Sequence, residues 1–170
     1  MIKTERLLLR PMQKSDADDL FAVFSDADVM RYFDDRHQNI ETTHAWVGAS
    51  VDAPRAETLE FVLVLDDRVI GKAGIWKRPE IGFLLNRPHW GRGLMHEALA
   101  NLIPHFFAEM ALERITADVD PRNAASLGLL AHLGFRETHR AENTIEIAGE
   151  WCDSVFLALD YSEWRQSHPV

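Results

Sequence analysis

The stretch from Glu80 to Glu97, EIGFLLNRPHWGRGLMHE, constrains the fold most. It reads as a short apolar strand, a corner containing a proline, and a turn with Gly91 and Gly93 that opens onto a helix. Backbone N–H groups at a helix start have no intrahelical partner and carry a partial positive charge, so a glycine turn that admits an anion is a ready phosphate site. On these residues alone, the alternative is a turn whose glycines only shape the connection.

The glycine turn does not fit the common nucleotide or metal motifs. A P-loop needs G-x-x-x-x-G-K-[ST], which is missing here, and the third glycine of a dinucleotide fingerprint would fall on His96. His96 and Glu97 begin an HExxH pattern, but Ala100 stands where the second histidine ligand belongs. No G-x-S-x-G motif is found, so nucleotide hydrolysis, nicotinamide binding, a metal site and serine-hydrolase chemistry are all disfavoured.

Length, composition and charge further limit the kind of protein that this sequence can encode. A chain of 170 residues with 46% hydrophobic content predicts one domain over residues 1–170. The net charge of -9 argues against nucleic acid as a partner and favours a cationic one, such as a protonated amine. The single cysteine, Cys152, lies in a strand-like run and predicts a small buried thiol. The N-terminal apolar run is only three leucines flanked by charges, which predicts a cytoplasmic protein without a membrane partner.

Apolar periodicity predicts one sheet of about seven strands with helices between them, an α/β fold. The expected strands lie near residues 7–10, 60–65, 69–76, 80–85, 114–119, 136–147 and 151–159. The expected helices lie near residues 15–24, 25–33, 39–50, 94–110 and 123–133, and the tail after Asp160 is expected to be loosely held. Asn39 and Asn123 are expected N-caps and Gly134 a left-handed C-cap, while Pro104 predicts a kink or break in its helix.

Three segments together match one family. Residues 90–99 resemble the WGxGxxxEAL form of the acetyl-coenzyme A loop in GCN5-related N-acetyltransferases (GNATs). Residues 122–135 resemble the RNxxSxxLLxxLGF helix of that family, and residues 4–11 resemble the TERLxLRP start of its ribosomal-protein (RimJ/RimL-like) branch. The three segments occur in the family's order and span nearly the whole chain. They identify the family specifically but say little about the substrate.

The resemblance implies a GNAT-type fold and acetyl-coenzyme A as cosubstrate. The sheet is then mixed but mostly antiparallel, flanked by helices, with a splayed central strand pair formed by residues 83–85 and 114–119. The turn N–H groups would hold the pyrophosphate, Arg92 would add a charge-assisted contact, and the pantetheine arm would pair with the strand edge. The implied cofactor-binding residues are Phe83, Leu84, Leu85, Trp90, Gly91, Arg92, Gly93, Leu94, Met95 and Asn123.

Two residues carry the implied chemistry. Glu80 begins the strand that would hold the acetyl group and matches a glutamate of many relatives, so it is the expected base, acting through water; a surface carboxylate at the strand end is the alternative. Ser126 lies one helical turn after Asn123, where its hydroxyl would donate a proton to the leaving thiolate or simply pack. A backbone N–H near Leu85 would stabilise the oxyanion.

The sequence departs from the family pattern at three positions. Leu130 stands where many relatives have a tyrosine as proton donor to sulfur, so that role passes to Ser126, to water or to nothing. Met95 replaces a smaller residue, which predicts crowding of the cofactor, and Trp90 replaces the glutamine or arginine of the wider family.

The resulting prediction is acetyl transfer from acetyl-coenzyme A to a primary amine by direct attack on the thioester. The expected acceptor is a protein or peptide N-terminus, with a small-molecule amine left open, and the resemblance is compatible with a homodimer. The alternative is a catalytically weak acyl-coenzyme A sensor.

Overall fold

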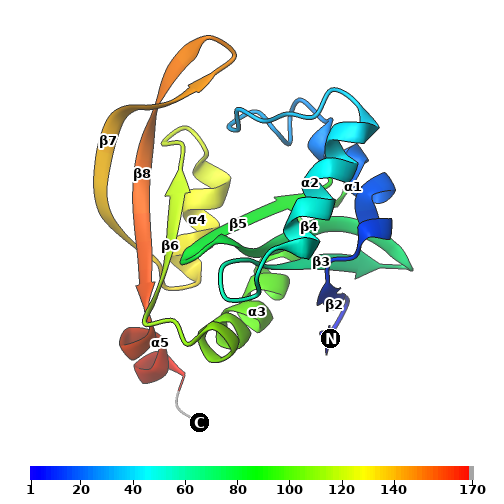
Figure 1. The fold of residues 1–170 in the computed structure, drawn as a ribbon. Coiled ribbons are helices and arrows are strands. Elements are labelled where there is room, and N and C mark those ends of the chain that lie inside the picture. The colour runs from blue at the N-terminus through cyan, green and yellow to red at the C-terminus, as the bar shows by residue number, and fades with distance from the viewer. Residues whose placement is uncertain (169–170) are drawn as a thin grey trace.

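A single eight-stranded sheet organises the molecule in the computed structural model, which describes residues 1–168 (Figure 1). The strand order across the sheet is β1-β2-β3-β4-β5-β6-β8-β7. The strands are β1 (Ile2–Lys3), β2 (Leu8–Pro11), β3 (Leu59–Leu65), β4 (Arg68–Lys77), β5 (Glu80–Leu85), β6 (Arg114–Val119), β7 (Arg136–Ile147) and β8 (Glu150–Asp160). The expected α/β sheet is confirmed, with the two-residue β1 as the additional strand.

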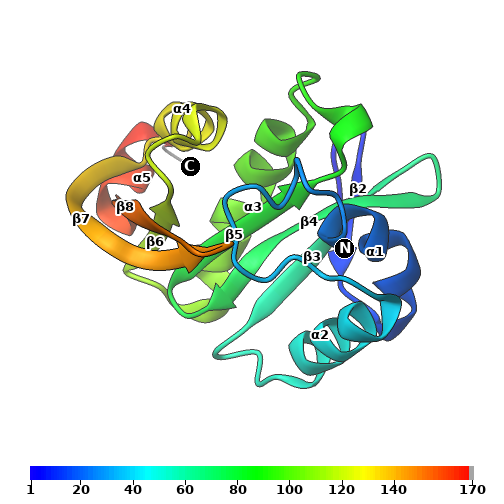
Figure 2. The same ribbon diagram turned by 90° about the horizontal axis from the view of Figure 1, so that it is seen from above.

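Helices lie on both faces of the sheet. They are α1 (Ala17–Phe24), α2 (Ile40–Asp52), α3 (Leu94–Met110), α4 (Ala124–His132) and α5 (Tyr161–Ser167), with 3₁₀ turns at Lys14–Asp16 and Arg87–His89. Seen from above, α3, α4 and α5 lie on one face, whereas α1 and α2 cover the opposite face only over the β3–β5 half (Figure 2).

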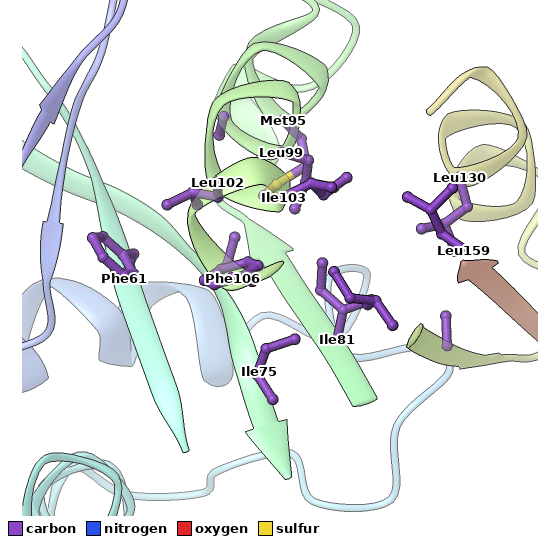
Figure 3. Close-up of a cluster of buried hydrophobic side chains, with 14 of the residues drawn as sticks. Phe61, Ile75, Ile81, Met95, Leu99, Leu102, Ile103, Phe106, Leu130 and Leu159 are labelled. Atoms are coloured by element: carbon purple, nitrogen blue, oxygen red, sulfur yellow. The ribbon is translucent and has the colours of Figure 1, made fainter. Parts of the chain in front are cut away.

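Two separate apolar cores hold these layers together, one on each face. In the larger core, α3 packs Leu99, Leu102 and Phe106 against Phe61 and Ile75 of the sheet (Figure 3). All five side chains are at most 1% exposed to solvent, so the burial of each contributes about 1.5–3 kcal/mol to the free energy of folding. This buried packing holds α3 firmly against the central strands of the sheet.

The central strands β5 and β6 are the only parallel neighbours in the sheet of residues 1–168. They pair at one point, Glu80 with Thr116, and the amide of Thr116 donates to the Pro79 carbonyl at 3.1 Å. Beyond that point the two strands diverge (Figure 1). The predicted splayed pair is confirmed, and the gap leaves one edge of β5 without a neighbouring strand.

Three sequence expectations differ from the structure. The expected short helix and turn over residues 25–33 are only turns, although Asp26 has the contacts of a helix N-cap: its carboxylate accepts from the amides of Asp28 and Val29, and its carbonyl accepts from the Met30 amide. A regular helix does not follow, because the next backbone bond in this segment, from the Phe33 amide to the Met30 carbonyl, spans three residues instead of four. Helix α3 continues through Pro104 without the expected break, and a kink there stays a prediction; the carbonyl that loses its partner belongs to the exposed residue Ala100.

The tail after Asp160 is ordered as α5 rather than loosely held. The indole of Trp164 lies 5.5 Å from the Phe107 ring, which docks α5 onto the larger core. The last two residues of that predicted tail lie outside the described range. None of the helices within residues 1–168 has the length and apolar character needed to cross a bilayer.

Candidate active site

A cleft of about 590 Å³ opens where β5 and β6 diverge. Four segments form its walls: the end of β5, the glycine turn with the start of α3, the start of α4, and the loop between α1 and α2. The last of these crosses above β5 toward the half that contains β6 and α4 (Figure 2). Nine of the expected cofactor-binding residues line this cleft, namely Phe83, Leu84, Leu85, Trp90, Gly91, Gly93, Leu94, Met95 and Asn123.

The glycine turn has the backbone shape that an anion site requires. Gly91 and Gly93 have φ angles of +69° and +72°, which other residues adopt only at a cost, and Gly93 immediately precedes α3. The free N–H groups of the first turn of α3 belong to residues that line the cleft, among them Leu94 and Met95. The side chain of Met95 is 7% exposed and belongs to the larger core, but Met95 also lines the cleft, so crowding of the cofactor stays a prediction.

Arg92 is the one expected cofactor-binding residue that does not line the cleft. Its guanidinium Nη1 donates to His89 Nδ1 at 3.2 Å on the exposed side of the turn. Direct contact between Arg92 and a phosphate remains a prediction.

An N-terminal segment that sequence reasoning did not assign to the site holds the glycine turn from behind. The Glu97 carboxylate accepts from Thr4 Oγ1 at 2.5 Å, from the Arg6 amide at 2.8 Å and from Arg6 Nε at 2.6 Å. Arg6 Nη1 then donates to the Arg92 carbonyl at 2.7 Å. Burial raises the pKa of Glu97, but the hydrogen bonds from Thr4 and Arg6 outweigh it and hold this pKa below its usual value.

The free edge of β5 presents backbone groups to the cleft. The amide of Asn86 donates to the Ile70 carbonyl of β4, so by strand alternation the backbone groups of Phe83 and Leu85 face the other way, toward the gap. The Trp90 indole Nε1 donates to the Leu85 carbonyl at 2.7 Å. Trp90 thus occupies one acceptor of this edge, a role that no sequence pattern indicated.

The start of α4 forms the opposite wall. Asn123 caps this helix as predicted, its Oδ1 accepting from the Ser126 amide at 3.1 Å, and both residues line the cleft. Leu130, in contrast, is fully buried beside Leu159 in the larger core (Figure 3). Ser126 therefore supplies a hydroxyl to this wall, whereas the position of Leu130 points to the core.

The diverging strands β5 and β6 form a V, whose closed end is the point where the two strands pair. Glu80 lies at this closed end and is not part of the cleft lining. Burial raises the pKa of its carboxyl, a hydrogen bond from Trp76 Nε1 at 3.1 Å opposes that rise, and the nearby Asp118 carboxylate adds to it. The structure thus separates the two expected catalytic residues: Ser126 faces the cleft, and Glu80 lies where β5 and β6 meet.

A contact across the mouth of the V was also not predicted. The Tyr32 hydroxyl donates to the Arg122 carbonyl at 3.3 Å, and the Arg122 guanidinium lies 5.7 Å from the Tyr32 ring centre. Arg122 is held in place by Asp120, whose carboxylate accepts from Nε at 2.9 Å and from Nη2 at 2.7 Å. Tyr32 and Arg122 therefore join the loop after α1 to the start of α4.

These features describe a site for an elongated ligand with a phosphate group at one end. The glycine turn offers N–H groups to the anion, the β5 edge offers backbone groups to an amide-containing arm, and Ser126 lies across from that edge. The residues present fit acetyl-coenzyme A, which combines a pyrophosphate, two amides and a thioester.

Comparison with known proteins agrees with this geometry. The family described as Acetyltransferase (GNAT) domain matches residues 6–136. The uncharacterized N-acetyltransferase p20 of Bacillus licheniformis is 36% identical over 167 residues, which cover 92% of this chain and 93% of that protein. The [ribosomal protein uS5]-alanine N-acetyltransferase of Escherichia coli is 36% identical over 84 residues, covering 49% and 43% of the two chains. The crystal structure of a GNAT-family acetyltransferase from Bacillus anthracis superposes with a TM-score of 0.80 at 27% identity, covering 94% of this chain and 97% of that one.

The splayed strands, the glycine turn and these relatives lead to one conclusion: this chain belongs to the acetyltransferase (GNAT) family and is an acetyl-coenzyme A-dependent N-acetyltransferase.

Proposed function

We propose that the acceptor is the α-amino group of a protein or peptide and that this amine attacks the thioester directly. The observation that carries the proposal is the single cleft in which the glycine turn, the free β5 edge and the Ser126 hydroxyl meet. The E. coli relative is named a [ribosomal protein uS5]-alanine N-acetyltransferase, and the only amine that an alanine residue can offer is its α-amino group, which supports an α-amine. An α-amine has a pKa of about 8, so roughly a tenth is neutral near pH 7, whereas lysine, at about 10.4, is almost fully protonated.

Each wall of the cleft has a role in binding. The N–H groups from Gly91 to Met95 hold the pyrophosphate at the start of α3. The backbone of Phe83 and Leu85 pairs with the pantetheine arm as an added strand would, and Asn123 contacts that arm from α4. Bound in this way, acetyl-coenzyme A supplies an activated acyl group between the two splayed strands.

The chain's own groups move the protons. The Leu85 N–H, on the free edge, donates to the acyl oxygen, where a fixed dipole needs little rearrangement. Glu80 accepts the amine proton through water, and its raised pKa brings it closer to the working pH of a general base. Ser126 donates a proton to the departing thiolate. Cys152 is buried and does not line the cofactor cleft, which favours direct transfer over an acyl-enzyme.

The direct test measures release of free coenzyme A from acetyl-coenzyme A in the presence of peptides, polyamines, aminoglycosides and amino acids. We expect amine-dependent turnover that is fastest with unblocked peptides and absent with the same peptides carrying a blocked N-terminus. Faster turnover with lysine side chains or polyamines would overturn the α-amine assignment. Tight acetyl-coenzyme A binding without turnover across the panel would instead favour a sensor. A cytoplasmic location and a homodimer stay predictions.

A further inference from the structure

A second cavity of about 450 Å³ lies next to the cofactor cleft. The two share three lining residues, Arg31, Tyr32 and Arg122, so the Tyr32–Arg122 contact forms the partition between them. The far wall of the second cavity comes from the turn of the β7–β8 hairpin, with Ile147, Ala148 and Glu150. In Figure 2 the tip of this hairpin approaches the loop between α1 and α2 over β5.

The charged side chains around the second cavity differ in whether they have an ion-pair partner. The Arg122 guanidinium is neutralised by Asp120, and its Nη1 lies 3.8 Å from Glu150 Oε1. Asp28 lines the adjoining cleft, and its carboxylate Oδ2 forms an ion pair with Arg87 Nη1 at 2.8 Å. Arg31, in contrast, lines both cavities and makes no ion pair or side-chain hydrogen bond within residues 1–168.

The Arg31 guanidinium is therefore a local positive charge in a chain whose net charge is -9. It has the planar donor geometry that suits carboxylates. The neighbouring Tyr32 ring and the Ile147 and Ala148 side chains add an apolar surface for the rest of an extended chain.

We infer that the second cavity receives the residues that follow the acceptor amine, and that Arg31 selects an acidic side chain among them. The inference rests on the proposed function, because it takes the acceptor to be a peptide. An amine at the Tyr32–Arg122 partition has the cofactor cleft on one side and the Arg31 guanidinium beside it. The ligand class of this cavity is therefore a peptide N-terminus whose second or third residue is aspartate or glutamate.

The experiment compares three short peptides that begin with the same residue and differ only at the second and third positions, which carry aspartate, asparagine or lysine. The wild-type kcat/KM should be about fivefold higher for the aspartate peptide than for the asparagine peptide, as for one partly exposed ion pair, and the ratio should shrink as salt is raised. In the Arg31→Glu variant the order should invert, with the lysine peptide preferred.

Arg36→Glu is the matched control, because Arg36 is an exposed residue of the same loop that lines neither cavity and makes no ion pair within residues 1–168. It should keep the wild-type preference. Equal kcat/KM for all three peptides, or the same inversion in both variants, overturns the role of Arg31 while leaving acetyl transfer to peptides intact. Failure of all three peptides to react overturns the peptide assignment itself, and with it this inference.

Discussion

The two ends of β5 differ in nearly every physical respect. At its first residue, Glu80, the strand is paired on both sides, with Lys77 of β4 and Thr116 of β6. At its last residue, Leu85, it is paired only with β4, and its other edge opens into the cleft. The closed end carries a half-buried carboxylate with a raised pKa, whereas the open end carries backbone dipoles and a glycine turn.

On the proposed mechanism, this difference separates proton transfer from cofactor binding along one strand. Backbone groups at the open end are fixed donors and acceptors that do not titrate near neutral pH, so they suit binding. The carboxylate at the closed end titrates, so it suits proton transfer. Substitutions at the closed end should therefore change kcat and its pH dependence, and substitutions at the open end should change acetyl-coenzyme A affinity.

The largest effect is expected at the closed end. Glu80→Gln should lower kcat by about a hundredfold, the usual contribution of a positioned general base, with unchanged acetyl-coenzyme A affinity. The loss should be greatest at low pH, where fewer amines are already neutral. The measurement is a pH–rate profile, and a profile identical to wild type would remove Glu80 from the mechanism.

Trp76→Phe sharpens the same comparison. It removes the indole hydrogen bond that lowers the pKa of Glu80. Because the base acts in its deprotonated form, the acid limb of the profile should move to higher pH. An acid limb that stays in place would indicate that another group titrates there.

At the open end, Gly93→Val should weaken acetyl-coenzyme A binding by about tenfold or more. A β-branched residue at a φ of +72° costs about 1–3 kcal/mol, so the free turn should relax to another conformation and binding must restore the strained one. Isothermal titration calorimetry measures the change. Gly48→Val is the matched control, since Gly48 lies in α2 with open space where a side chain would be. Wild-type affinity in the Gly93 variant would show that the phosphate site has been misplaced.

A smaller effect is expected behind the turn. Glu97→Gln keeps the size of the side chain but removes the charge that binds Arg6, so the KM for acetyl-coenzyme A should rise about fivefold with little change in kcat. The lowered folded pKa of Glu97 means that its carboxylate contributes stability above the unfolded pKa and loses it as pH falls through the folded pKa.

Thermal melts of the Glu97→Gln variant should therefore differ from wild type at neutral pH and converge in acid. Glu137→Gln serves as a control because it removes a similar arginine partner, Arg140, on the exposed strand β7. An equal rise in KM for both variants would contradict a specific role for Glu97.

The smallest effect is expected across the cleft. Ser126→Ala should lower kcat about threefold, as for one neutral hydrogen bond, because water can replace its hydroxyl as proton donor. Acetyl-coenzyme A affinity should not change, since the Asn123 cap bonds the Ser126 amide, which alanine retains. A changed affinity with constant kcat would assign Ser126 to binding.

Local rules predicted those parts of the fold and site that depend on a few adjacent residues. Asn39 and Asn123 cap their helices through their side chains, and Gly134 adopts a φ of +92°. The glycine turn belongs to the same class, because its geometry follows from Gly91 and Gly93 alone. Prediction failed where a helix start is not continued: Asp26 accepts from the amides of Asp28 and Val29 as an N-cap does, yet residues 25–33 form only turns.

Contacts between distant segments could not be predicted in the same way. Arg6 and Glu97 are 91 positions apart, and Tyr32 and Arg122 are 90 apart. A charged residue on a strand or loop has many partners compatible with its sequence context, and only the folded topology selects one. The contacts near the cleft that sequence reasoning missed are of this distant kind, whereas the glycine turn and the Asn123 cap, which it predicted, are local.

The hydrogen bond from the Trp90 indole to the Leu85 carbonyl has a spectroscopic consequence. Trp90 is 46% exposed and lines the cofactor cleft, the only one of the five tryptophans to do so, and all five lie within residues 1–168. A ligand arm along β5 would displace water from one face of the indole and shift its emission. The protein therefore carries its own fluorescent reporter of cofactor occupancy, whose signal Trp90→Phe should abolish.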